Sequence, residues 1–172
     1  MLVILSAFLF GCIPWITNYI YDEGINRESV VLLRNLLELP VLGVLAWHQN
    51  KSFRIPVKAL PAIGVIALMG CCVTPLLLYG SYQHIATGTV TVFHFVYPAV
   101  VVLIGLVFLR KKINSVTLLA GMLCVGGICL FNNRDESLDW DGCGLALASG
   151  ITYAIYVVLF QRFAIRRYPV FN

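Results

Sequence analysis

Two oppositely charged residues lie inside otherwise apolar sequence, where a charge could act on a proton or a substrate. Arg34 and Glu38 are four residues apart, so they share one face if this segment is a helix. Glu38 is the only carboxylate within an apolar run, and an ionisable group in hydrocarbon is costly unless it faces protein or water. The pair is therefore either a proton- or substrate-linked charge in a cavity or an internal ion pair that holds its helix.

A second group of candidates consists of aromatic residues with polar tips in three other apolar runs. They are Trp15, Tyr79, His94 and Tyr97. Such rings can bind organic or cationic substrates by stacking and by cation–π contact, although tyrosine and tryptophan also serve as anchors at membrane interfaces. His94 could relay protons near neutral pH or form a packing hydrogen bond. Together with Arg34 and Glu38, these four residues make up the predicted substrate site.

Other kinds of site chemistry find less support. Ser81, His84 and His94 are close in sequence and would suit an intramembrane hydrolase, but Ser81 does not lie in a Gly-x-Ser-x-Gly turn. No Walker A pattern occurs, and the six cysteines have neither zinc spacing nor a disulfide framework. The sequence therefore predicts a protein that is not an enzyme and needs no metal or cofactor, with the hydrolase as the weaker alternative.

These candidate residues must be positioned by membrane helices. The chain has 172 residues, of which 60% are hydrophobic and 12% are charged, whereas soluble domains carry about 25% charged residues. The charged residues gather in short clusters between apolar runs close to the ~20 residues that cross a bilayer. We expect an all-α, polytopic bundle of about six transmembrane helices, at about 2–21, 30–47, 59–82, 88–109, 116–131 and 142–161.

Lysine and arginine are distributed unevenly between alternate loops, which predicts the orientation of the chain. Nine of them lie in the loops at 48–58 and 110–115 and after the sixth span, against two in the opposite loops. Loops rich in these residues stay on the cytoplasmic side, so both termini are predicted to be cytoplasmic in a multi-pass protein of the cell membrane. The basic residues adjoin the spans and form no separate domain, which predicts contact with membrane lipid and not with nucleic acid.

Four of the six predicted spans contain proline. Pro14, Pro40, Pro75 and Pro98 lack a backbone N–H and would kink or interrupt their helices. The freed carbonyl groups could line a cavity in a gated bundle. The alternative is that these prolines are simply tolerated, as proline commonly is in membrane helices.

Several short motifs follow one another in a recognisable order along the chain. They are Phe10-Gly11, Leu33-Arg34, the stretch 88–100 with its mid-helix Pro98, the basic turn after it, Leu118-Leu119-Ala120-Gly121, and 144–162. In this order the chain resembles the EamA branch of the drug/metabolite transporter superfamily. The resemblance implies two inverted five-helix repeats, with a first repeat at 1–131 and the first helix of a second, incomplete repeat at 142–172.

The same resemblance implies a function. It predicts a secondary transporter of small metabolites, amino acids or drug-like organic molecules that works by alternating access. The chain departs from the family pattern at Lys111, where a glutamate is common, and at Asn172, which stands four helices short of a complete second repeat. We therefore expect it to act with a second copy or a missing second repeat, and the alternative is a truncated remnant that does not transport.

Overall fold

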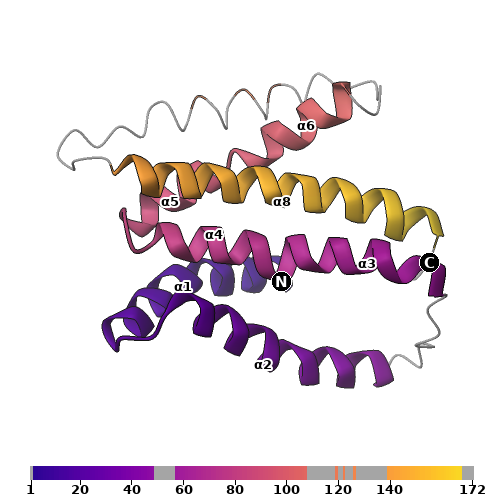
Figure 1. The fold of residues 1–172 in the computed structure, drawn as a ribbon, viewed down its shortest axis with the longest axis horizontal. Helices are drawn as coiled ribbons and strands as arrows, with labels where there is room; N and C mark the ends of the chain where they lie inside the picture. The colour runs from indigo at the N-terminus through magenta and orange to yellow at the C-terminus, as the bar shows by residue number, and fades with distance from the viewer. Residues whose placement is uncertain are drawn as a thin grey trace. The chain divides into compact units, whose positions relative to one another are not determined.

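The computed structural model describes residues 2–48, 57–107 and 139–167, together with single positions at 119, 122 and 126. All regular elements in these ranges are helices (Figure 1), which confirms the predicted all-α class. In chain order they are α1 Leu2–Asp22, α2 Arg27–His48, the 3-10 helix η1 Val57–Ala59, α3 Leu60–Ala67, the π-helix η2 Leu68–Val73, α4 Thr74–Ser81, α5 Thr87–His94, α6 Tyr97–Val107 and α8 Trp140–Arg167.

Three of the helical stretches in the described residues are long and apolar enough to cross a membrane. They are Leu60–Ser81, Thr87–Val107 and Trp140–Arg162, and they coincide with the predicted spans at 59–82, 88–109 and 142–161. The helices α1 and α2 occupy the first two predicted spans. The predicted fifth span, 116–131, lies outside the described residues apart from three single positions. Helices therefore occupy five of the six predicted positions.

The helices α1 and α2 belong to the first of two compact units, residues 1–60. α1 ends in a glycine turn, in which the N–H of Gly24 donates to the carbonyl of Tyr21 at 2.9 Å and the N–H of Ile25 donates to that of Ile20 at 3.4 Å. Gly24 has a φ of 81°, a left-handed conformation that glycine adopts without steric cost. This turn satisfies carbonyl groups at the end of α1 and reverses the chain into α2.

The second unit, residues 61–172, is built around α8. This helix packs against α4, α5 and α6, and Figure 1 shows α4 and α6 on opposite sides of it. Its contacts with the η2–α4 segment run antiparallel. Gly70 lies against the ring of Tyr156, and Thr74, four residues further along, donates to Thr152, four residues further back on α8, at 3.1 Å.

The helix α5 runs parallel to α8. Two side-chain hydrogen bonds join this part of the chain to the start of α8, His84 to Asp139 and His94 to Ser149, and each spans 55 residues. A constant sequence separation means that both segments advance in the same direction. This direction agrees with the predicted order of spans, in which the fourth and the sixth cross the membrane in the same sense.

A π-helical turn interrupts the third predicted span next to a proline. The N–H of Thr74 bonds to the carbonyl of Met69, five residues back, directly before Pro75. In an α-helix the proline ring would clash with the carbonyl four residues earlier, and a π turn widens the helix at that point. The predicted interruption at Pro75 therefore takes the form of a π turn.

The fourth predicted span is broken shortly before its proline. α5 ends at His94 and α6 begins at Tyr97, which places Pro98 in the first turn of α6, where its missing N–H costs no helical bond. By contrast, α1 and α2 continue through Pro14 and Pro40. Two of the four prolines thus accompany a break, and two do not.

The helix α8 closely approaches the α5–α6 break at Gly150. A Cβ at this position would lie 2.8 Å from the backbone carbonyl oxygen of His94 and 2.9 Å from Cγ1 of Val96. Because the first of these atoms belongs to the backbone, it cannot move aside without shifting a helix. The absence of a side chain at Gly150 therefore lets the break pack directly against α8.

We expect Gly150→Ala to lower the thermal unfolding temperature in detergent, because overpacking of such a contact typically costs about 1–3 kcal/mol. Gly144→Ala, in the same helix, is the matched control, since a Cβ at Gly144 meets nothing within 4 Å and alanine has the higher helix propensity. A Gly150→Ala protein that unfolds at or above the temperature of Gly144→Ala would contradict this account of the contact.

Candidate functional site

His94 is a buried polar residue at the end of α5, with 7% of its surface exposed. Its Nδ1 lies 2.8 Å from Oγ of Ser149, a fully buried residue of α8. Ser149 Oγ donates its single hydrogen to the carbonyl of Ala146 at 2.7 Å, so both bonds form together only if His94 Nδ1 carries a hydrogen. In neutral His94, Nε2 is therefore the nitrogen without a hydrogen.

The break between α5 and α6 brings two aromatic residues together against α8. Tyr97 meets Tyr153 edge to face, with ring centroids 4.8 Å apart and planes at 88°, an arrangement in which a positive ring edge faces a negative ring face. The His94 ring lies 5.8 Å from Tyr97 and 5.5 Å from Tyr153. We call His94, Tyr97, Ser149 and Tyr153 the His94 cluster.

An aromatic row continues from this cluster along one face of α8. Tyr153, Tyr156 and Phe160 follow one another at helical spacing, and their neighbouring ring centroids lie 5.7 and 6.0 Å apart. The Tyr156 ring lies against the backbone of Gly70, where a Cβ would be 2.6 Å from a ring carbon. The row therefore extends from the α5–α6 break to the π turn η2.

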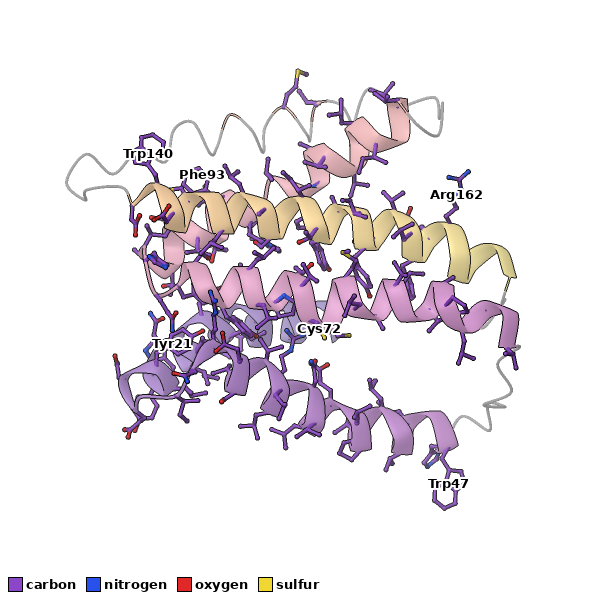
Figure 2. All side chains as sticks on the ribbon, viewed as in Figure 1. Tyr21, Trp47, Cys72, Phe93, Trp140 and Arg162 are labelled. Atoms are coloured by element: carbon purple, nitrogen blue, oxygen red, sulfur yellow. The ribbon has the colours of Figure 1, made fainter. Side chains whose placement is uncertain are left out.

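Both helix breaks face the same stretch of α8. Thr74, at the end of the π turn, bonds to Thr152, and Gly150 packs on the α5–α6 break. Figure 2 shows Trp140 and Arg162 near opposite ends of α8, so this stretch lies well inside the span between them. Irregular backbone at such depth is tolerated where protein covers it or where it lines a cavity.

Of the predicted aromatic residues, the structure brings His94 and Tyr97 together. Tyr79 is buried on α4, and its ring centroid lies 6.0 Å from that of Tyr82. Trp15 belongs to α1 in the first unit, where 76% of its surface is exposed. Substrate binding by these residues stays a prediction.

The ion pair predicted from spacing forms within α2. Arg34 Nε donates to Glu38 Oε1 at 2.8 Å. A second ion pair nearer the start of α2, Arg27 Nε with Glu28 Oε1, has the same N–O distance. Pairing lowers the cost of placing both charges of Arg34 and Glu38 in an apolar helix. A part for Glu38 in transport stays a prediction beside this structural role.

The described residues hold no support for the hydrolase alternative. Ser81 is buried and donates to the carbonyl of Leu78 at 2.7 Å. While the hydroxyl of Ser149 donates to the carbonyl of Ala146, His94 can only donate to Ser149, which is the reverse of a serine activated by a histidine base. Nor does this part of the chain contain three or more His, Cys, Asp or Glu residues grouped to hold a metal ion.

A charged contact ties the start of α8 to the turn between α4 and α5. Asp139 caps α8, because its carbonyl accepts from the N–H of Cys143 and its Oδ1 from the N–H of Asp141, both at 3.0 Å. Its Oδ2 accepts from His84 Nδ1 at 2.9 Å. The backbone N–H of Asp141 and then the His84 side chain hold the pKa of Asp139 below its ordinary value.

The prediction from sequence did not include Ser149, Tyr153 and Tyr156. A usable signal existed, because these polar and aromatic residues fall at steps of four and three and therefore share one face of the sixth predicted span. The pattern alone did not indicate which other span this face contacts. That pairing comes only from the fold.

The fold and the site define a polytopic α-helical membrane protein with irregular backbone inside its spans. The model of the EamA-like transporter family matches residues 1–133. The match covers more than half of the chain, so the chain belongs to the EamA-like transporter family, whose members carry small molecules across membranes. This confirms the resemblance found in the motifs. No curated protein and no solved structure is significantly similar to it.

We expect Asp139→Ala to lower the unfolding temperature in detergent at about pH 7, since it removes both the helix cap and the partner of His84. The lowered pKa adds a pH dependence: the stabilisation is complete above the unfolded-state value of about 3.9 and disappears as the pH falls through the lower folded-state value. Asp139→Asn keeps a capping side chain without a titrating group and is the matched control. Equal unfolding temperatures for Asp139→Ala and the wild-type protein at about pH 7 would show that Asp139 does not stabilise the start of α8.

Proposed function

We propose that this chain belongs to a secondary transporter that moves small organic molecules, such as metabolites, amino acids or drug-like compounds, by alternating access. Membership of the EamA-like transporter family supports transport of small molecules. The observation that carries the finer proposal is that a π turn within Leu60–Ser81 and the interruption between α5 and α6 both face one stretch inside the α8 span. Secondary transporters bind their substrates near the bilayer midplane at discontinuous helices.

The His94 cluster is the proposed point of substrate contact. It offers the aromatic faces of Tyr97 and Tyr153 and the polar atoms of His94, and it contains no permanently charged side chain. Aromatic faces stack on planar groups and attract organic cations. The cluster therefore favours neutral or cationic organic substrates over acidic ones.

The proposed orientation places the protein in the cell membrane with both termini in the cytoplasm. It is supported by the excess of lysine and arginine in alternate loops. In this orientation the contact between His84 and Asp139 lies on the outer side and Arg162 on the cytoplasmic side. A second copy of the chain or a second repeat would complete the inverted pair that the family architecture implies.

Uptake by purified protein in liposomes tests the proposed function. The panel is leucine, lysine, glutamate, ethidium and methyl viologen, and we expect uptake of at least one neutral or cationic compound and none of glutamate. Tyr153→Ala should reduce that uptake by roughly tenfold, the effect of losing ~1.4 kcal/mol of ring contact. Tyr153→Phe keeps the ring and should retain uptake. Monodisperse protein that moves no member of the panel would argue against a transporter.

The ion pair of α2 supplies an independent test. We expect Glu38→Gln to abolish uptake at normal expression, because it removes the carboxylate that lies within a predicted span. Glu28→Gln is the matched control and should leave uptake unchanged. Glu28 forms an ion pair of the same N–O distance near the start of the same helix. If Glu38→Gln transports normally, Glu38 is a structural partner of Arg34 only.

A further inference from the structure

His94 has an unusual position among the ionisable residues of the three long apolar spans, Leu60–Ser81, Thr87–Val107 and Trp140–Arg162. It is their only Asp, Glu, Lys, Arg or His away from the ends, because Asp141 and Arg162 stand near the two ends of the α8 span. Such a residue is costly at this depth, and where it occurs it commonly belongs to a proton or ion pathway.

The hydrogen bonds leave one nitrogen of His94 able to accept a proton. Nδ1–H donates to Ser149, and the hydroxyl hydrogen of Ser149 is used by the carbonyl of Ala146. The lone pair therefore resides on Nε2. Addition of a proton to Nε2 gives the imidazolium ion without breaking either bond.

The surroundings of the ring suit a proton that is held only temporarily. The titratable side chains that face it are Tyr97 of α6 and Tyr153 of α8, with centroids inside the ~6 Å range of cation–π contact. Among the described contacts of His94, none is with an acidic or basic side chain. Both tyrosine rings are thus close enough to interact with the imidazolium ion, and no acidic side chain among these contacts retains it.

His94 also occupies the point at which a change of charge can move a helix. It is the last residue of α5, and its carbonyl oxygen is in the close contact with Gly150. A charged ring needs water or additional dipoles, which become available to a buried side chain when the break separates from α8. Proton binding therefore favours the opened arrangement, and proton loss favours the packed one.

From these observations we propose that His94 carries the coupling proton, so that transport is driven by a proton gradient. A proton adds to Nε2 from one side of the membrane and leaves Nε2 to the other side, and Nδ1 keeps its own hydrogen throughout. The inference rests on the proposed transport function and adds the identity of the coupling ion.

The protonation of the ring is testable without a substrate. Nitrogen-15 NMR of histidine-labelled protein in lipid nanodiscs, with the His94 signal assigned by its loss in His94→Gln, should show the hydrogen on Nδ1 at about pH 8. Acidification should then add a hydrogen to Nε2. A neutral His94 with its hydrogen on Nε2 would overturn the proposal.

Coupling is measured in liposomes that contain a pH-sensitive dye, with valinomycin and equal potassium to hold the membrane potential at zero. The probe is the panel compound that wild-type protein transports. One proton per molecule at a pH difference of about 1 unit supports about tenfold accumulation, since each factor of ten corresponds to 1.4 kcal/mol. His94→Gln keeps a donor for Ser149 but lacks the nitrogen that accepts the proton, so it should show neither accumulation of the compound nor a dye response. His84→Gln, outside the described spans, should still accumulate it.

The outcomes separate the two proposals. Uptake by wild-type protein with neither accumulation nor dye response overturns the coupling and leaves the transporter intact, whereas absence of all uptake overturns both. Accumulation by His94→Gln also overturns the coupling. Should His94→Gln fail to purify as a monodisperse protein, Ser149→Ala replaces it, because it removes the bond that orients the ring. That variant should accumulate the compound with a shifted pH profile, and an unchanged profile would overturn the assignment.

Discussion

The second unit depends on the close approach of α8 to neighbouring backbone. At Gly150 the helix meets the carbonyl of His94, and at Gly70 the neighbouring π turn meets the ring of Tyr156. In each contact a glycine removes the side chain that would hold the helices apart. Apolar side chains gain little free energy when they leave lipid tails for another helix. Membrane helices therefore associate through such close packing and through hydrogen bonds. These two contacts hold both helix breaks against one helix.

Broken helices in a membrane require that their polar groups find partners within the protein, because hydrocarbon offers none. Hydroxyl groups near the breaks do this locally: Thr91 donates to the carbonyl of Thr87 at 2.7 Å, and Thr152 donates to that of Ala148 at 3.0 Å. Among the described residues, every fully buried side-chain nitrogen or oxygen has a hydrogen-bond partner. The packed arrangement is therefore complete in itself, and any opening at the breaks must exchange these partners for water or substrate.

Local spacing predicted the features of this fold that are local. The length of apolar runs placed five helices, and a separation of four residues predicted the pair of Arg34 and Glu38. The contact of His94 with Ser149 joins residues 55 apart, and no local pattern encodes which helix faces meet. Proline marked the sites of possible breaks, but the form of each break depends on neighbours, as the π turn before Pro75 shows.

The directions of the helices also place the His94 cluster in depth. The contact of His84 with Asp139 marks the level at which α8 begins. From Asp139 to Ser149 the chain advances ten residues along α8, and a helix rises about 15 Å over that length. The hydrocarbon layer is about 30 Å thick. If α8 crosses it close to the normal, the bond between His94 and Ser149 falls near the middle of the layer, where a substrate or a proton is equally far from both sides.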